Sequence, residues 1–248
     1  GCMAQNKQDE IFDRLPHVPD EVAYYFHAKY FAAGHLYLPE PPEPKAFTCS
    51  LALLHAGKWY SAQLPGWPFV LALGVRAGVP WLVNPLLGAI AILISFALVR
   101  KLYDEPLAKG VVLLLAFSPW LLYMSANLMG HALSLVLSLA ALLAVQRARE
   151  SGSLGWAALA GACLGGLANT RPLEALAMGI VVALWWLSAG WKRLRIAAVA
   201  ISMLVAMSLV GLQLAYNQAL TNNPWELPFE KVDEVAYRGA NRVGFGPD

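Results

Sequence analysis

Apolar residues dominate most of the chain in long uninterrupted runs. No Asp, Glu, Lys or Arg occurs in residues 77–99, 110–146, 151–170 and 196–225. A helix that crosses a bilayer needs about 20 consecutive apolar residues, and the second run is long enough for two such helices. The pattern therefore predicts an all-α, polytopic membrane protein.

Six spans are expected, with a shorter apolar helix ahead of them. The spans are predicted at residues 81–99, 107–124, 128–147, 155–171, 172–190 and 194–216. The stretch 66–79 is too short to cross, so we interpret it as an interfacial or re-entrant helix. Pro119 predicts a kink in the second span. Gly161, Gly165 and Gly166 give the fourth span a small-residue face for close helix contact.

Composition supports the membrane assignment and excludes several other classes. Hydrophobic residues make up 58% of the chain and charged residues 14%, whereas soluble domains average about a quarter charged residues. The net charge of +2 comes with no basic stripe, so a nucleic-acid partner is not expected. The sequence also lacks a phosphate-cradling glycine loop, a Cys-x-x-Cys pair and a His-Glu-x-x-His motif, which argues against an ATPase or a zinc protease.

The polar segments divide the chain into three parts. Residues 1–66 form a first extracytoplasmic loop with interfacial helices, residues 67–216 form the transmembrane bundle, and residues 217–248 begin a C-terminal extracytoplasmic segment. The first ten residues, GCMAQNKQDE, include no initiating Met and form neither a signal peptide nor a span. We therefore expect a fragment that has lost its first transmembrane helix.

Basic residues are unevenly distributed over the short loops. One set of loops carries eight of them: Arg100, Lys101, Lys109, Arg147, Arg149, Lys192, Arg193 and Arg195. The alternate set carries only Arg171. Because basic loops stay in the cytoplasm, residues 1–66, Arg171 and the tail after Tyr216 are expected to share the outer face. Three polar segments far apart in sequence would then meet, as they do in a site.

Two adjacent carboxylates, Asp20 and Glu21, begin an aromatic-rich helical pattern directly after Pro19. One interpretation is helix capping, because acids are favourable at a positive helix N-terminus. The other is chemistry, since a carboxylate at the outer interface can act as a general base. Composition alone leaves both interpretations open.

Arg171 stands between two apolar spans in the motif LANTRPLEAL. Arginine at a membrane boundary is energetically costly and usually has an anionic partner. That partner could be Glu174 or a lipid phosphate, in a structural role. Alternatively, Arg171 binds a substrate phosphate, which a guanidinium holds with two parallel hydrogen bonds.

Other polar residues carry weaker signals. His131, near the outer start of the third span, is either a hydrated helix-end residue or a further ligand of the same phosphate. Lys58, Tyr60, Ser61 and Gln63 lie where the outer loop returns to the membrane. Of these we expect Lys58 to contribute to phosphate binding, and Tyr60 and Gln63 to contribute to substrate binding.

The order of these motifs resembles the GT-C superfamily of membrane glycosyltransferases, in particular bacterial enzymes related to protein O-mannosyltransferases and to the lipid A aminoarabinose transferase. The segments that carry the resemblance are PDEVAYYFHAKYFAAGHL, YSAQLPGWPFVLALG, LVNPLLGAIAILISFALVRKLYD, SPWLLYMSANLMGHAL, GLANTRPLEALA and YNQALTNNPWELPFE. Two positions depart from the family pattern: Leu64 replaces the first of two prolines, and Ala62 replaces a Lys or Gln.

The resemblance implies a GT-C-like helix bundle and a polyprenyl-phosphate-linked sugar as donor. It implies that Asp20 is the catalytic base, with Glu21 beside it. Arg171 would bind the donor phosphate and compensate its growing charge. Tyr24, Asn169 and Glu174, which lie within the matching motifs, complete the expected substrate-binding residues.

The acceptor would be a lipid, glycan or protein on the outer side of the bacterial inner membrane. No definite cofactor is predicted, and a role for a divalent metal is left open. The alternative function is a transporter or flippase of a lipid-linked substrate. Such proteins bury ionisable groups near the bilayer midplane, whereas here these groups gather at one face. A third alternative is a non-catalytic membrane subunit with the same fold.

Overall fold

The protein is predominantly helical in the computed structural model, which describes residues 16, 18–43, 47, 51–188 and 196–236. The α-helices are α1 (Pro19–Ala32), α2 (Gly66–Arg76), α3 (Val83–Leu102), α4 (Glu105–Ala116), α5 (Pro119–Ala126), α6 (His131–Ser151), α7 (Leu154–Ala168), α8 (Pro172–Leu187), α9 (Ile196–Thr221) and α10 (Pro228–Ala236). The strands are β1 (Leu38–Pro39), β2 (Ala52–His55) and β3 (Lys58–Ser61). The predicted helical class is thus confirmed.

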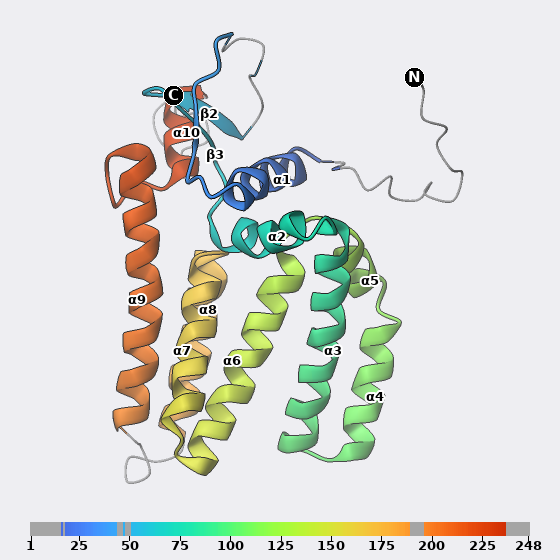
Figure 1. Ribbon diagram of the computed structural model, residues 1–248. Helices are drawn as coiled ribbons and strands as arrows, with labels where there is room; N and C mark the ends of the chain where they lie inside the picture. The colour runs from blue at the N-terminus through green and yellow to red at the C-terminus, as the bar shows by residue number, and fades with distance from the viewer. Residues whose placement is uncertain (1–15, 17, 44–46, 48–50, 189–195, 237–248) are drawn as a thin grey trace, which may run out of the picture.

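Helices α3, α4, α6, α7, α8 and α9 stand side by side as a bundle, and α1 and α2 lie across one end of it (Figure 1). The stretch predicted as an interfacial or re-entrant helix corresponds to α2. The turn between α7 and α8 and the last turns of α9 lie at the same end as α1. The described parts of the three polar segments are therefore together at one end of the bundle.

The tightest helix pair joins α7 to α9. A side chain at Gly161 would collide with the backbone of Ser202, and one at Gly165 would collide with Leu209. The Ser202 hydroxyl donates a hydrogen bond to the carbonyl of Ala157 across this contact, at 2.7 Å. The third predicted glycine, Gly166, faces Leu137 of α6 instead. The prediction of a small-residue contact face is confirmed, and its main partner is α9.

A bend divides the second predicted span at Pro119. Helices α4 and α5 meet at an angle of 56°, because Pro119 cannot donate the next intrahelical hydrogen bond. Ser118 precedes the break, and its hydroxyl accepts a hydrogen bond from the backbone N–H of Leu121 at 3.4 Å. The predicted kink is confirmed.

A small sheet, which the sequence analysis did not predict, lies above α1. The strand order is β1-β3-β2, and both pairs are antiparallel. Residues from the sheet, from the end of α9 and from α10 form one hydrophobic cluster: Leu53, Tyr60, Ala62, Tyr216, Leu220 and Val232. Residues 1–66 were expected to form a loop with interfacial helices, and no strand was predicted there. The strands were missed because β1 has two residues and β2 and β3 have four each.

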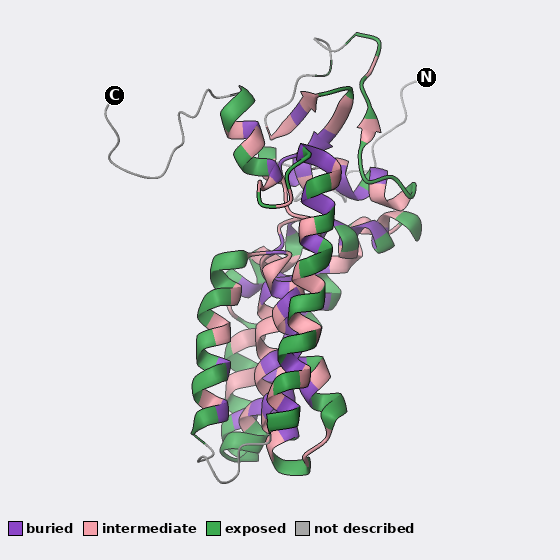
Figure 2. Ribbon diagram, turned by 90° about the vertical axis from the view of Figure 1, so that its left-hand side faces the viewer, coloured by how far each residue is buried: buried purple, intermediate pink, exposed green. Residues whose placement is uncertain are grey.

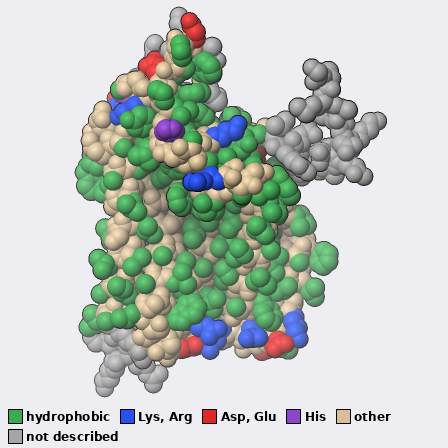
Figure 3. Space-filling view, viewed as in Figure 1, with side chains coloured by type: hydrophobic (Ala, Val, Ile, Leu, Met, Phe, Trp, Pro, Cys, Tyr) green, Lys and Arg blue, Asp and Glu red, His purple; other side chains and the backbone are tan. Residues whose placement is uncertain are grey.

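The surface of the bundle is apolar between its two ends. On the face seen in Figure 3, charged side chains gather at the ends and leave a broad apolar belt between them. Figure 2 shows that exposed residues cover the outer sides of the helices while buried residues concentrate inside. At the end opposite α1, Lys101 pairs with Glu150 and Lys109 with Glu105, each at 2.8 Å. Lys192, Arg193 and Arg195 lie outside the described residues.

Three helical stretches are long and apolar enough to cross a membrane, namely Pro80–Leu102, His131–Ser151 and Ile196–Thr221. The bent pair α4–α5 is a fourth candidate. Helices α7 and α8 are apolar but have only 15 and 16 residues. The described helices are thus consistent with an integral membrane protein, and the number of six spans stays a prediction.

Candidate functional site

The turn between α7 and α8 is held against the start of α2. The backbone N–H of Gly66 donates to the carbonyl of Asn169 at 2.9 Å. Only glycine fits here, since a Cβ at position 66 would collide with Thr170 and with the backbone of Asn169. The Asn169 amide nitrogen donates to the carbonyls of Gly165 and Leu209, at 2.8 and 3.0 Å. Asn169, which was predicted to bind substrate, therefore uses its amide N–H groups to fix this turn.

Arg171 directly follows this turn and joins two further predicted residues. Its Nη1 forms an ion pair with Glu174 Oε1 at 2.8 Å, and its Nη2 lies 2.8 Å from His131 Nε2. The Arg171 side chain is 30% exposed, so water and ligands can reach it. A guanidinium has five N–H donors, and these two contacts leave three for an anionic ligand. The Glu174 pairing and the His131 contact, considered separately from the sequence, occur together.

Asp20 lies in the first turn of α1 and is partly buried. Its Oδ1 accepts a hydrogen bond from Gln63 Nε2 at 2.9 Å. No side chain caps α1, whose N-cap position is Val18. Asp20 thus contacts a residue far away in sequence and makes no capping hydrogen bond. Gln63, which was predicted to bind substrate, orients this carboxylate.

Tyr24 connects the two charged groups electrostatically. Burial raises the pKa of Tyr24, the positive charge of Arg171 opposes that increase, and the negative charge of Asp20 adds to it. The Tyr24 hydroxyl is therefore within electrostatic reach of both Arg171 and Asp20, which are 151 positions apart in the sequence (171 − 20). The predicted base and the predicted phosphate ligand thus both act through their charges on Tyr24, a predicted substrate residue.

Glu21 points elsewhere. It is only 3% exposed, and its Oε1 accepts a hydrogen bond from the backbone N–H of Leu128 at 3.1 Å. Leu128 belongs to the turn between α5 and α6, residues 127–130. The two adjacent carboxylates therefore face different surroundings, because successive residues of a helix do not share a face.

Lys58 and Tyr60 are not brought to this cluster. Lys58 Nζ donates to the carbonyl of Ala219 at 2.8 Å, which ties strand β3 to the end of α9. Tyr60 is completely buried among the hydrophobic residues beneath the sheet. That burial raises its pKa to about 12. The structure places both residues where they connect the sheet to α9.

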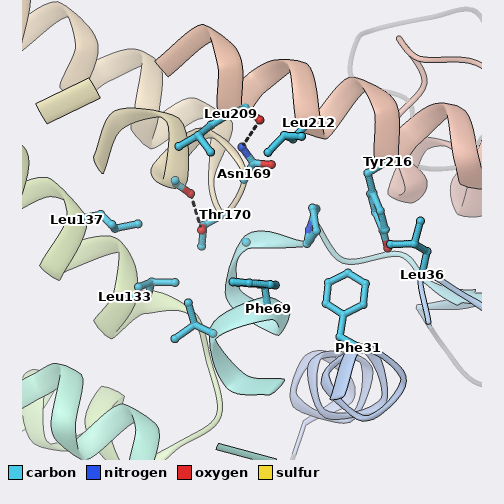
Figure 4. A pocket seen from close by; sticks show the side chains of 14 residues that line it. Phe31, Leu36, Phe69, Leu133, Leu137, Asn169, Thr170, Leu209, Leu212 and Tyr216 are labelled. Atoms are coloured by element: carbon cyan, nitrogen blue, oxygen red, sulfur yellow. Dashed lines mark hydrogen bonds between the residues drawn. The ribbon is translucent and has the colours of Figure 1, made fainter. Parts of the chain in front are cut away.

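A cavity of about 540 Å³ lies beside the α7–α8 turn (Figure 4). Its walls come from α1, α2, α6, α7 and α9 and are almost entirely apolar; the labelled residues are Phe31, Leu36, Phe69, Leu133, Leu137, Asn169, Thr170, Leu209, Leu212 and Tyr216. Asn169 and Thr170, immediately before Arg171, are the polar part of the wall toward the turn. The sequence analysis missed this cavity because its lining residues belong to ordinary apolar helices.

The described residues contain no group of three or more His, Cys, Asp or Glu side chains that could hold a metal ion. The role of a divalent metal, left open by the sequence, stays untested. Comparison with protein-family models, curated proteins and solved structures gives no match for this chain.

Proposed function

We propose that this protein is a membrane-embedded glycosyltransferase. It transfers a sugar from a polyprenyl-phosphate donor to a hydroxyl of a lipid, glycan or protein acceptor, with inversion at the anomeric carbon. The observation that carries the proposal is that Asp20 and Arg171 both act electrostatically on Tyr24, at the end of the bundle where an apolar cavity adjoins the α7–α8 turn. The GT-C resemblance of the motifs supports the same assignment.

The bundle crosses the bacterial inner membrane six times in this proposal, with the site on the outer face. The basic residues of the loops opposite α1 support that orientation. At about 1.5 Å per residue, α7 and α8 are shorter than the roughly 30 Å hydrocarbon core. The turn that carries Arg171 consequently does not rise above the lipid headgroups, and local thinning of the bilayer around two short helices would bring a lipid-linked phosphate to it.

In the proposed reaction, Asp20 removes the proton from the acceptor hydroxyl. The acceptor oxygen attacks the anomeric carbon and forms the new glycosidic bond, while the bond from that carbon to the phosphate oxygen breaks. The electron pair leaves with the polyprenyl phosphate, whose charge the remaining N–H donors of Arg171 stabilise. Because the phosphate is already a good leaving group, no general acid is needed.

The cavity supports a lipid-linked donor rather than a free sugar phosphate. Its walls at Phe69, Leu133, Leu137, Leu209 and Leu212 offer apolar surface to a prenyl segment. Burying such a segment contributes about 25 cal/mol for each Å² of apolar surface removed from water. The headgroup phosphate would then lie near Arg171, beyond Asn169 and Thr170.

Two measurements test the proposal on the full-length protein in liposomes. Binding of a fluorescent polyprenyl monophosphate should be saturable and weakened by Arg171→Ala. Sugar transfer from polyprenyl-phosphate sugars should follow, with water or an added hydroxyl compound as acceptor. Saturable binding with movement of the lipid across the bilayer but no transfer would establish the transporter alternative instead. Absence of binding would contradict both functions.

Orientation has its own test. In a background with the natural cysteines replaced by serine, Glu105→Cys and Ser151→Cys should resist a membrane-impermeant thiol reagent in intact cells, whereas Glu40→Cys should react. All three positions are exposed. Labelling of the first two without permeabilisation would overturn the proposed orientation.

A further inference from the structure

We infer that Glu21 and His131 are positioning residues that fix the guanidinium of Arg171, acting through the turn formed by residues 127–130 and the start of α6. This inference rests on the proposed function for its purpose, because it assigns the two residues to the phosphate-binding arginine. It gives His131 a role other than direct phosphate binding and separates Glu21 from the catalytic pair, the roles that the sequence had suggested.

Glu21 starts the connection from α1. Its side chain is almost fully buried and accepts the backbone N–H of Leu128. A buried N–H without an acceptor is destabilising by about 1–3 kcal/mol, so the carboxylate strongly favours this position of the turn. Because Asp20 is the preceding residue of α1, the helix that presents the base also holds the turn.

Two more helices hold the same turn. The indole N–H of Trp67, on α2, donates to the carbonyl of Leu128 at 2.8 Å. The amide of Asn84, on α3, donates to the carbonyls of Asn127 and Met129, at 2.5 and 2.8 Å. The N–H of Met129 in turn binds the side chain of Asn127 at 3.0 Å. Every backbone N–H and carbonyl from the Asn127 carbonyl to the Met129 carbonyl thus has a hydrogen-bond partner. These hydrogen bonds fix the position of the turn.

The turn leads directly into His131, the first residue of α6. An arginine donates hydrogen bonds and cannot accept them, so His131 Nε2 must be the acceptor in its 2.8 Å contact with Arg171 Nη2. The imidazole is consequently neutral, with its proton on Nδ1. In that form His131 orients the guanidinium without competing with it for an anion.

Glu174 and His131 contact different nitrogens of the Arg171 guanidinium, Glu174 at Nη1 and His131 at Nη2. The guanidinium is planar, so two contacts on separate nitrogens fix both its position and its plane. A ligand phosphate can bind the three remaining N–H donors while both contacts persist. The neutral His131 imidazole orients Arg171 without offsetting its positive charge, whereas the Glu174 carboxylate offsets it.

The first test is a double-mutant cycle on full-length protein in liposomes, read by binding of a fluorescent polyprenyl monophosphate. His131→Ala should weaken binding about tenfold, as expected for loss of a hydrogen bond to a charged group, while His131→Gln, which keeps an acceptor, should restore part of it. In an Arg171→Ala background, His131→Ala should have no further effect. Equal losses in both backgrounds would mean that His131 contacts the ligand itself and would overturn the inference.

The role of Glu21 is tested by the same double-mutant cycle. Glu21→Gln keeps an oxygen that accepts the Leu128 N–H, so lipid phosphate binding should stay within about twofold of wild type. Glu21→Ala should weaken binding when Arg171 is present and should have no further effect in the Arg171→Ala variant. In a transfer assay, the loss should fall on KM for the donor with little change in kcat. A kcat loss for Glu21→Gln comparable to that of Asp20→Asn would overturn the positioning role.

A ligand-free measurement separates this inference from the proposed function. The chain has five histidines, and ¹⁵N spectra of histidine-labelled protein in detergent report the tautomer of each. The His131 signal, assigned by its loss in His131→Gln, should show a proton on Nδ1 and shift in both Arg171→Gln and Glu21→Ala. A proton on Nε2, or an unchanged signal in Arg171→Gln, would overturn the inference. The expected spectra with no lipid phosphate binding would leave the positioning intact and contradict the proposed function.

Discussion

In its first half α1 carries Asp20 and Tyr24, which lie close to charged groups and to solvent; in its second half it carries His27 and Tyr30, which are sealed inside the protein. Asp20 is partly buried and keeps one oxygen outside its hydrogen bond to Gln63. His27 has no exposed surface, and its Nε2 lies 2.9 Å from the hydroxyl of Tyr216. The rings of His27 and Tyr30 stack at 4.7 Å.

Burial therefore separates two uses of polar side chains on one helix. In the second half, burial lowers the pKa of His27 to about 3, so the imidazole is neutral at ordinary pH and joins α1 to α9. In the first half, Asp20 is partly exposed and uses one carboxylate oxygen in its hydrogen bond to Gln63, whereas the adjacent Glu21 is buried and binds Leu128. Burial therefore distinguishes Asp20, which a ligand can reach, from Glu21, His27 and Tyr30, which make structural contacts.

The largest expected effect concerns Asp20. Asp20→Asn keeps the shape of the side chain and an oxygen for Gln63, so folding and lipid phosphate binding should persist. Loss of a general base should reduce turnover by about 10²–10⁴. The measurement is sugar transfer at saturating donor. Near-normal turnover in a well-folded variant would place Asp20 with the structural half of the helix.

Arg171→Lys is expected to have the second-largest effect. The ammonium keeps the charge but cannot contact Glu174, His131 and a phosphate in one planar arrangement, so kcat/KM should fall about ten- to a hundredfold. Glu174→Gln is the matched control, because it removes the ion pair and keeps the guanidinium. If the two variants reduced transfer equally, the Arg171–Glu174 pair would be structural.

Tyr216→Phe, a change on α9, tests the buried second half of α1. The change removes the hydroxyl that partners His27 and leaves a buried imidazole nitrogen without a hydrogen bond, which should reduce the free energy of unfolding by about 1–3 kcal/mol. Affinity for a lipid phosphate should change little, because Phe keeps the aromatic ring that Tyr216 contributes to the cavity wall. Thermal unfolding in detergent and the binding assay provide the two measurements. A loss of affinity without a loss of stability would reverse the contrast between the halves.

The pH dependence of stability gives the most specific effect. His27 has a pKa of about 3 in the folded protein and about 6.5 when unfolded. Between these values the unfolded state binds more protons, so stability is complete above about pH 6.5 and is lost as pH falls toward 3, by up to about 1.4 kcal/mol per pH unit. Unfolding of wild type and of His27→Gln between pH 7 and 5 should diverge, with the variant less dependent on pH. Parallel curves would show that His27 becomes protonated in the folded protein.

The sequence was most informative where a physical rule acts on neighbouring residues. Apolar runs predicted the bundle helices, and Pro119 predicted the bend, because both depend on local backbone and hydropathy. The loop at Arg171 was singled out because a cation between two apolar runs needs a partner. What stayed hidden depends on distant contacts: Gln63 against Asp20, and Glu21 against Leu128.

The sheet and the cavity were hidden for different reasons. The strands of the first loop are shorter than any pattern that alternation can reveal, and they form because β3 pairs on both sides. The cavity is a gap between helices whose individual sequences satisfy the same apolar rule as a filled interior. Only the relative placement of α2, α6 and α9 creates it.

Helix α9 has 26 residues, which at 1.5 Å per residue corresponds to about 39 Å. In the proposed orientation, a hydrocarbon core of roughly 30 Å would leave about two turns of α9 in the headgroup layer, and Lys58 anchors the sheet to Ala219 in those turns. The length of α9 would then set the height of the sheet relative to the bilayer. Lengthening α9 by four residues would raise the sheet by about 6 Å with little rotation, whereas adding two would turn it by about 200°.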